Sequence, residues 1–298
     1  MGIAGPDAVA PLPDAVAPLP DAAVPLVVKV SGKVGDSYQA VVADLAGLAR
    51  TGRPVVLVHG GSATIDQVSR ERGIAPRRVV SASGVEGRFT GEADIATLLM
   101  ATAGLVNKSL VVQLHQHGVG AFGLSGVDGG LLRGPRKDVL RIVEGGKTRL
   151  LRGNHSGYVE QVDAALLRTL IGHGLVPVLA PLALSWDGRV INVDGDRVAA
   201  AVATALKASD LVLLSDVEGL TDGTGGALVR HGRLAELDAR LMPMASGRMR
   251  VKLAAAAAAL TSGVARVAIA SALAPAPVTA ALSGGGTQLF PGDHNGPG

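Results

Sequence analysis

The chain has no cysteine and few aromatic residues, only 2% of its 298 positions. The absence of cysteine excludes disulfides, thiolate catalysis and Cys-ligated zinc or iron–sulfur centres. With so few aromatic rings, the core must be built from alanine, valine and leucine. The hydrophobic content of 48% is enough for one large α/β domain or two lobes.

Long apolar runs and strong charge are also missing. No stretch of 18 apolar residues is free of polar breaks, and no basic segment precedes a short hydrophobic run. We therefore expect neither a transmembrane helix nor a signal peptide, and a cytoplasmic location. A formal charge of +3 is too small to indicate a nucleic-acid-binding protein. Neither a nucleic acid nor a membrane is an expected partner.

The first residues differ from the rest in composition. PDAVAPL at 6–12 recurs at 13–19 and, imperfectly, at 20–26. Prolines at this spacing would interrupt a helix, so the seven-residue period does not indicate a coiled coil. Residues 1–24 are predicted to be a disordered or polyproline-like Pro/Ala-rich tail without a role in the chemistry.

Strand and helix patterns alternate after the tail, which predicts an α/β fold: an open, mostly parallel central sheet with helices on both faces. The expected strands cover 27–30, 54–59, 121–124, 176–180, 211–215, 267–270 and 287–290. The expected helices cover 38–50, 62–72, 92–99 with a broken continuation towards 117, 159–173, 194–207 and 247–262. Residues 131–152 look like the arms of a β-hairpin insertion around the turn at 144–147. We expect an acceptor-binding lobe at 25–182, which includes the hairpin, and a nucleotide-binding lobe at 183–298.

Three short segments together indicate a site for phosphate. KVSG (29–32) and HGGS (59–62) each end a β-branched run with small residues, and INVDGD (191–196) precedes an Ala-rich helix. Glycines at the end of a parallel strand let backbone N–H groups approach an anion, and a nearby lysine adds a point charge. This combination predicts phosphoryl transfer.

Other familiar signatures fail in their context. GVGAFG at 118–123 spells a dinucleotide fingerprint, but it follows a helix and precedes a strand, which is the reverse order. The chain has no P-loop sequence, and HGGS has no accompanying GxSxG elbow, which disfavours a serine hydrolase. His115 and His117 lie two residues apart, a spacing that would place them on different helix faces, so no metal site is predicted.

Eight segments in series resemble the amino-acid kinase family, most closely its acetylglutamate-kinase branch. They are KVSG (29–32), VHGG (58–61), RFT (88–90), GLVNK (104–108), GLSGVDG (123–129), NVDGD (192–196), LLSDVEGL (213–220) and GRMRVK (247–252). Carbamate, uridylate and aspartate kinases share the fold, but GLSGVDG and the basic hairpin favour a kinase that acts on a carrier-linked amino acid. One departure is Ser31, which stands where many family members have glycine.

The resemblance implies that an acceptor carboxylate attacks the γ-phosphorus of ATP and gives an acyl phosphate. It implies that Lys29 binds the moving phosphoryl group, Lys252 the leaving side, and Asp196 both ammonium groups. From the residues alone, Lys29 could equally be a strand-edge lysine, and Asp196 and Lys252 ordinary helix charges.

The resemblance also implies a set of binding residues. Gly32, Gly60 and Gly61 would offer backbone N–H groups to the phosphoryl group, and Arg88 and Asn192 would fix the acceptor. The nucleotide pocket would comprise Ser215, Asp216, Gly219, Leu220, Gly247 and Met249. Mg²⁺ would be held mainly by ATP oxygens and water, so no protein metal ligands are predicted.

The acceptor is indicated by a concentration of basic residues. Residues 131–152 carry seven cations against two carboxylates, and a cluster of this size suits a macromolecular anion. The sequence here looks like the subgroup that phosphorylates 2-aminoadipate or glutamate tethered to an acidic amino-group carrier protein (the LysW-linked type). The expected carrier contacts are Arg133, Arg136, Lys137 and Arg141.

Two alternatives stay open. The chain could be an N-acetylglutamate kinase of arginine biosynthesis, or a non-catalytic nucleotide- or amino-acid-binding regulator on the same fold. A solvated hairpin would explain the cations without a carrier. The family suggests a homodimer through the acceptor lobe, and the Pro-rich repeat cannot supply the N-terminal helix associated with arginine-sensitive hexamers.

Overall fold

The computed structural model describes residues 24–32, 38–75, 77–80, 86–145, 147–223 and 226–292. Nearly all of the N-terminal repeat lies outside these ranges, so the tail stays a prediction.

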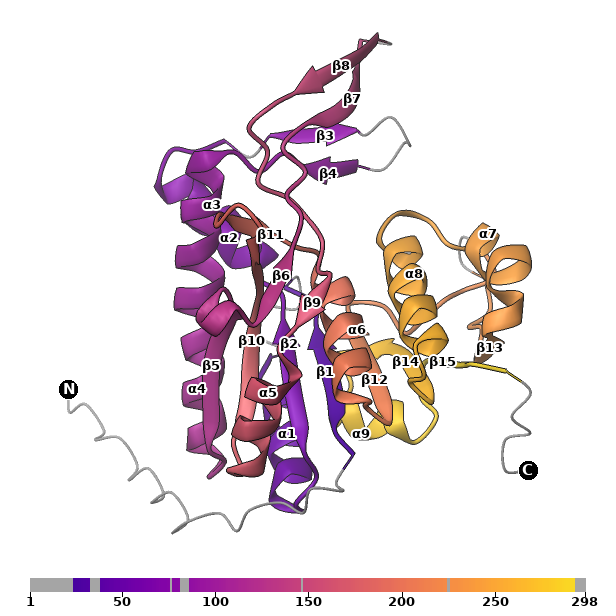
Figure 1. The fold of residues 1–298 in the computed structure, drawn as a ribbon. Helices are drawn as coiled ribbons and strands as arrows, with labels where there is room; N and C mark the ends of the chain where they lie inside the picture. The colour runs from indigo at the N-terminus through magenta and orange to yellow at the C-terminus, as the bar shows by residue number, and fades with distance from the viewer. Residues whose placement is uncertain are drawn as a thin grey trace, which may run out of the picture.

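An eleven-stranded sheet organises the chain (Figure 1). Its five central strands are parallel, as predicted from their apolar, β-branched sequences: β1 (Leu26–Val30), β2 (Val55–His59), β10 (Val176–Ser185), β12 (Asp210–Ser215) and β14 (Arg266–Ser271). The strand order is β13-β15-β14-β12-β1-β2-β10-β6-β9, with β5 and β11 also paired to β10. The outer strands are β5 (Ala121–Gly126), β6 (Leu132–Gly134), β9 (Gln161–Val162), β11 (Val190–Asn192), β13 (His231–Arg233) and β15 (Thr287–Phe290).

Helices cover both faces of the sheet, which confirms the predicted fold class (Figure 1). One layer contains α1 (Tyr38–Arg50), α4 (Asn107–Gln116) and α9 (Pro277–Leu282). The opposite layer contains α5 (Ala164–Gly172), α6 (Gly195–Leu206) and α8 (Gly247–Thr261). Each layer closes a separate apolar core against the sheet.

The alternation of side chains along β1 decides which layer each residue faces. Val28 and Val30 belong to the α1–α4 core, whereas Val27 belongs to the α6–α8 core. Lys29 has the same parity as Val27 and therefore faces α6 and α8. On the neighbouring strand, His59 is in register with Val30 and faces the α1–α4 layer.

One continuous helical segment runs from Glu92 to Gln116. It consists of α3 (Glu92–Leu98), a π-helical segment η2 (Leu99–Val106) and α4. The expected break is therefore a local widening and not an interruption. By length and composition this helix could cross a membrane, but 44% of its most apolar stretch is buried inside the fold. Core helices of globular proteins meet the same criterion.

Two small hairpins lie beyond the end of the main sheet (Figure 1). The first pairs β3 (Arg78–Val80) with β4 (Glu86–Arg88), and the second pairs β7 (Leu140–Glu144) with β8 (Lys147–Leu151). The predicted insertion at 131–152 is thus shorter than expected, because β6 joins the main sheet through β10 and β9. The expected lobe boundary at 182/183 falls inside β10, and the two-lobe division stays a prediction.

Other boundaries also needed correction. The helix expected over 159–173 starts only at Ala164, because β9 precedes it and Asp163 caps it by accepting hydrogen bonds from the N–H groups of Ala165 and Leu166. The remaining elements are α2 (Ser62–Glu71), α7 (Met242–Met244), η3 (Asp128–Gly130), η4 (Leu234–Glu236) and η5 (Leu237–Leu241).

Candidate active site

Two buried lysines converge on one buried carboxylate at the carboxyl end of β1. The Nζ atom of Lys29 lies 2.6 Å from Oδ1 of Asp196. The Nζ atom of Lys252 donates to both oxygens of the same carboxylate, at 3.1 and 3.2 Å. All three residues are no more than 5% exposed. The structure thus brings together the three residues that the sequence analysis grouped.

The local sequence explains this convergence. Lys29 reaches the α6–α8 layer because of its parity on β1. Asp194 caps α6 by accepting hydrogen bonds from the N–H groups of Asp196 and Arg197, which holds Asp196 in the first turn. Lys252 lies on α8, which packs against α6. A Cβ on Gly195 would lie 3.3 Å from Cε of Lys29, so glycine leaves room for the lysine.

The charges of the cluster are strongly coupled. Burial of Asp196 opposes its ionisation, but the charges of Lys29 and Lys252 outweigh burial and hold its pKa below the ordinary value. Burial and the nearby charge of Lys29 lower the pKa of Lys252 to about 8, although Asp196 opposes this shift. Two ammonium groups against one carboxylate leave excess positive charge, which suits a polyanionic ligand.

Glycines form the turns that follow β1 and β2 at the same edge of the sheet. A Cβ on Gly32 would overlap the backbone nitrogens of Gly61 and Ser62, and a Cβ on Gly60 would overlap the backbone of Gly32. These turns after β1 and β2 can therefore approach each other only as glycines. Helix α2 starts at this edge, and Gly61 is its N-cap residue. The phosphoryl-binding glycines predicted from sequence lie together here.

Backbone hydrogen bonds around β11 connect Asn192, a predicted acceptor contact, with His155 and Thr90. The N–H of His155 donates to the carbonyl of Thr90 at 2.7 Å, and the N–H of Asn192 donates to the carbonyl of His155 at 2.7 Å. The side chain of Asn192 donates to Oγ1 of Thr90 at 3.3 Å. Arg88 lies on β4, and its side chain falls outside what the structure describes.

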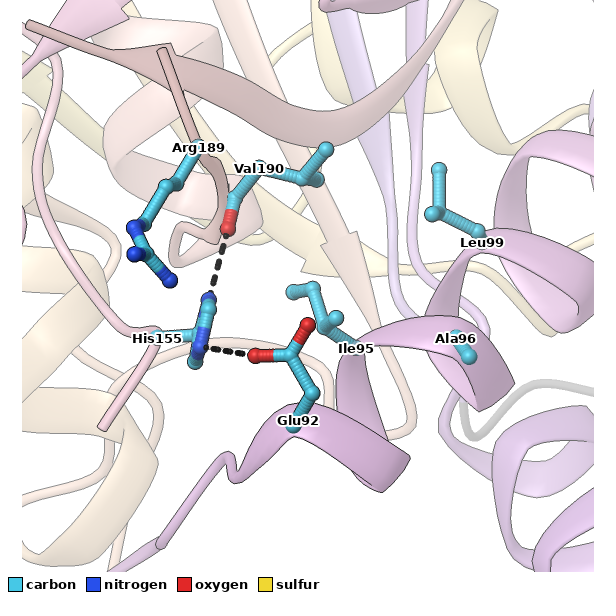
Figure 2. Close-up of a pocket in the computed structure, with 7 residues that line it drawn as sticks. All are labelled: Glu92, Ile95, Ala96, Leu99, His155, Arg189 and Val190. Atoms are coloured by element: carbon cyan, nitrogen blue, oxygen red, sulfur yellow. Dashed lines mark hydrogen bonds and ion pairs between the residues drawn. The ribbon is translucent and has the colours of Figure 1, made fainter. Parts of the chain in front are cut away.

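A pocket of about 410 Å³ opens beside β11 and α3. Its lining residues are Glu92, Ile95, Ala96, Leu99, His155, Arg189 and Val190 (Figure 2). Nε2 of His155 lies 2.9 Å from Oε2 of Glu92, and Nδ1 lies 3.2 Å from the Val190 carbonyl. Figure 2 shows Arg189 and the His155–Glu92 pair on the same side of the pocket, opposite the apolar Leu99. Sequence reasoning missed these residues, which lack a motif of their own.

The predicted nucleotide residues lie around the ends of β12 and α8. Ser215 ends β12, and its buried Oγ has no hydrogen-bond partner within the described ranges. Leu220 is buried and donates its N–H to Thr287 Oγ1 at 2.9 Å. Gly219 packs against the same threonine, where a Cβ would lie 2.5 Å from its hydroxyl oxygen. The three other residues of this set are Asp216 in the loop after β12, and Gly247 and Met249 at the start of α8.

The predicted carrier contacts differ in their availability. Arg141 is exposed on β7, whereas Arg133 lies on β6 in the main sheet. Lys137 is exposed and lies over the Tyr158 ring at 5.5 Å. Only 16% of the Arg136 side chain is exposed, and it lies 3.0 Å from Asp138 and 3.7 Å from Asp187. Arg136 is therefore partly neutralised within the fold.

Metal-binding side chains are not clustered in the part of the chain that the structure describes. Within it, no three His, Cys, Asp or Glu residues form a group that could hold a metal ion.

The fold places this site at the carboxyl edge of a parallel sheet, where open α/β proteins bind their ligands. The chain belongs to the amino acid kinase family, whose model matches residues 25–271. The resemblance found in the sequence is thereby confirmed.

Curated relatives align along most of the chain. A [LysW]-aminoadipate kinase from Deinococcus radiodurans is 44% identical over 266 residues, which cover 89% of this chain and 91% of the relative. One from Thermus thermophilus is 42% identical and covers 89% and 99%. A [LysW]-aminoadipate/[LysW]-glutamate kinase from Metallosphaera sedula is 36% identical and covers 89% and 99%.

Solved structures share the architecture. N-acetylglutamate synthase from Neisseria gonorrhoeae, complexed with coenzyme A and N-acetyl-glutamate, has a TM-score of 0.74 at 25% identity. The match covers 91% of this chain but only 60% of the synthase chain. Carbamate kinase from Giardia lamblia bound to AMP-PNP has a TM-score of 0.66 at 15% identity, covers 91% and 99%, and bears on the fold alone.

Proposed function

We propose that this protein is an ATP-dependent kinase that phosphorylates the side-chain carboxylate of 2-aminoadipate tethered to an acidic amino-group carrier protein. The observation that carries the proposal is the buried Lys29–Asp196–Lys252 cluster beside the glycine-lined strand edge. The names of the relatives at 44% and 42% identity supply the acceptor. A regulator on this fold would have no need of such a cluster.

The chemistry follows from the placement of charge. An acceptor carboxylate oxygen bonds to the γ-phosphorus of ATP while the bond from that phosphorus to the β–γ bridging oxygen breaks, and the electron pair leaves with ADP. Negative charge spreads over the transferring group in such a reaction, so the protein contributes mainly position and electrostatic stabilisation. Lys29 would bind the moving phosphoryl oxygens, and Lys252 the leaving β-phosphate.

Asp196 keeps these cations in place. Without ATP, two buried ammonium groups would repel each other, and one carboxylate between them offsets that repulsion. The N–H groups at the turns of Gly32, Gly60 and Gly61 would supply further donors to the phosphoryl group. The buried Ser215 hydroxyl and the start of α8 would bind the nucleotide.

Mg²⁺ is assigned to the nucleotide. ATP oxygens and water would coordinate the ion, which would neutralise part of the phosphate charge. The residues of the site fit such a complex, because Lys29 and Lys252 are buried cations whose excess charge an ATP polyanion would balance.

The pocket beside β11 would receive the acceptor. Asn192 and His155 share the backbone connection to Thr90, which joins the pocket to the predicted acceptor residues. The Arg189 guanidinium suits the carboxylates that a carrier-linked amino acid presents. Arg88 remains a predicted contact on the adjoining hairpin.

The exposed basic residues would meet the carrier. Arg141, Lys147 and Arg149 lie on the β7–β8 hairpin, which projects beyond the main sheet (Figure 1). Glu144 lies 3.1 Å from Arg149 and offsets part of this charge. Lys137 at the base of the hairpin adds another exposed cation. Such a surface favours encounter with an acidic partner.

Turnover with several acceptors tests the proposal. We expect ADP release with carrier-bound aminoadipate, less with carrier-bound glutamate, and little with free N-acetylglutamate. Efficient use of N-acetylglutamate with no response to the carrier would favour the acetylglutamate kinase. Lys29→Ala should lower turnover by about 10²-fold or more, the scale of a lost preorganised donor, whereas Lys207→Ala, on an exposed residue at the end of α6, should not. Equal turnover in both variants would contradict the assignment of the site.

We also propose a cytoplasmic homodimer. Met100, Leu105 and Val112 on the 92–116 helix, and Phe122 on adjoining β5, are about half exposed, and exposed apolar surface of this kind suits a protein contact. Light scattering tests the assembly: the wild type should have the mass of two chains and Leu105→Glu that of one.

A further inference from the structure

A buried polar network on the α1–α4 side of the sheet contacts the turn at Gly60, and the proposed mechanism does not use it. His59 and Asn107 are both 0% exposed. Nδ1 of His59 lies 2.8 Å from the Gly60 carbonyl oxygen, and Nε2 lies 3.1 Å from Nδ2 of Asn107. Tyr38 donates its hydroxyl to the same Gly60 carbonyl at 3.3 Å.

This network defines the tautomer of His59. A carbonyl oxygen can only accept, so Nδ1 carries the proton and donates to Gly60. The amide nitrogen of Asn107 can only donate, so Nε2 is the bare acceptor. Burial lowers the pKa of His59 to about 4, an effect that the bond to Gly60 opposes and the charge of Lys108 reinforces. The ring is therefore neutral at physiological pH, as its two partners require.

Asn107 is placed by several features of the surrounding sequence. It follows the π-helical segment Leu99–Val106, and such segments are frequent at functional sites. The same amide nitrogen, which has two N–H groups, also lies 2.8 Å from the Val178 carbonyl oxygen and 3.3 Å from that of Leu124, so one N–H is shared between two of its three acceptors. A Cβ on Gly123 would overlap the Asn107 side-chain oxygen, so glycine is needed there. Contacts with β5 and β10 thus fix the amide in the position from which it contacts His59.

The direction of the Gly60–Gly61 peptide follows from these contacts. A trans peptide is planar, and its N–H points opposite to its C=O. His59 and Tyr38 hold the Gly60 carbonyl on the α1–α4 side, so the Gly61 N–H points away from that side. The Gly61 nitrogen lies against the turn that follows β1, because a Cβ on Gly32 would overlap it. Gly32 comes three residues after Lys29 on the same strand edge.

We propose that His59 is a positioning residue, whose Nδ1–H fixes the Gly60 carbonyl so that the Gly61 N–H is directed at the transferring phosphoryl group. His59 faces the opposite side of the sheet from Lys29, so it can act on the reaction only through the backbone. Asn107 supports it by holding the tautomer. The inference rests on the proposed phosphoryl transfer.

Two substitutions separate this role from packing. Asn places its amide nitrogen near the position of Nδ1, so His59→Asn keeps a donor for Gly60, and Asn107 keeps its two carbonyl partners. Gln reaches the position of Nε2, so His59→Gln loses the donor to Gly60 although its volume is closer to that of histidine. We expect His59→Gln to lower kcat by about 10²-fold and His59→Asn by less than about fivefold, with KM for ATP changed by no more than about twofold in either.

The controls address stability and function separately. His173→Asn, at an exposed position, should leave kcat unchanged, and Tm should be recorded for every variant. A purely structural role predicts that His59→Asn is the poorer variant and that activity loss follows the loss of Tm; either result would overturn the proposal. Absence of acceptor-dependent turnover in the wild type would instead overturn the proposed function.

The ring tautomer gives a test that needs neither substitution nor substrate. In ¹⁵N-histidine-labelled protein we expect His59 to show a protonated Nδ1 and a bare Nε2 throughout pH 5–8. A protonated Nε2 with a bare Nδ1, or an imidazolium that titrates near pH 6.5, would overturn the assignment even if the His59 variants fail to fold.

Discussion

Lys29 and Lys252 place their ammonium groups on the same oxygen of Asp196, at 2.6 and 3.1 Å. Burial, together with the nearby charge of Lys29, lowers the pKa of Lys252 to about 8, although Asp196 opposes this shift. The cluster therefore carries excess positive charge, and a bound polyphosphate would reduce the repulsion between its two ammonium groups.

The pH dependence of catalysis should show the lowered pKa of Lys252. The profile of kcat/KM reports ionisations of the free enzyme, so kcat/KM for ATP should fall as pH rises past about 8 and Lys252 loses its proton. Lys252→Arg should move the falling limb above pH 10, because guanidinium stays protonated. Lys207→Arg, at an exposed position, is the control. A limb that stays near pH 8 in Lys252→Arg belongs to another group.

Stability should depend on the carboxylate at the centre of the cluster. Asp196→Asn leaves two buried ammonium groups without a counter-charge, and we expect the free energy of unfolding to fall by about 3–5 kcal/mol at pH 7. The folded pKa of Asp196 lies below its ordinary value of 3.8, so its contribution is present above about pH 4 and is lost as pH falls through the folded pKa. Urea denaturation across pH measures both effects.

The wild type and Asp196→Asn should differ in how their stability depends on pH. Below pH 4 the wild type should lose stability more steeply than Asp196→Asn, because only the wild type must protonate this carboxylate. Parallel curves would mean that the ion cluster contributes no pH-dependent stability.

Gly32 should tolerate no side chain. A methyl group there would overlap the backbone of Gly61 and Ser62, so Gly32→Ala must force the two turns apart. We expect turnover to fall by about 10²-fold or more, because the N–H donors move from the phosphoryl site. Gly47→Ala, in α1 with open space around the position, should keep full turnover and serves as the matched control. Full activity in Gly32→Ala would show that these turns do not bind the phosphoryl group.

Arg189 should distinguish acceptor binding from nucleotide binding. It lines the pocket beside β11, and 56% of its side chain is exposed. Arg189→Ala should raise KM for the carrier-bound acceptor by about tenfold, the scale of one charge-assisted contact, and leave KM for ATP unchanged. Steady-state kinetics with each substrate varied in turn measures the effect. Equal changes in both KM values would contradict an acceptor role for the pocket.

The sequence predicted the Lys29–Asp196–Lys252 cluster better than it predicted the pocket beside β11. Lys29, Asp196 and Lys252 each occupy a regular element, where strand parity or helix position determines direction. The pocket residues His155 and Glu92 meet only through the tertiary fold, and neither belongs to a local pattern. Their pairing depends on β11, a three-residue strand too short to give a periodic signal.

The hairpin shows the same limit. Its turn was recognisable from EGGK (144–147), but apolar residues at 131–134 could belong either to its arms or to the main sheet. The close packing at Gly134 shows that these residues belong to the main sheet. A Cβ there would overlap the carbonyl of Tyr158, which lies outside the hairpin. Charge counting also could not tell that Arg136 is paired with carboxylates while Arg141 is exposed.

Charge reversal on the hairpin should therefore be made at an exposed position. Arg141→Glu replaces a favourable long-range interaction with a repulsive one, so KM for the carrier-bound acceptor should rise by about tenfold at low salt and KM for ATP should not change. The defect should shrink as ionic strength rises, because screening weakens both interactions. Arg230→Glu makes the same change in net charge near β13, at the other end of the strand order, and should have little effect. Equal losses in both variants would assign the effect to net charge and not to a carrier surface on the hairpin.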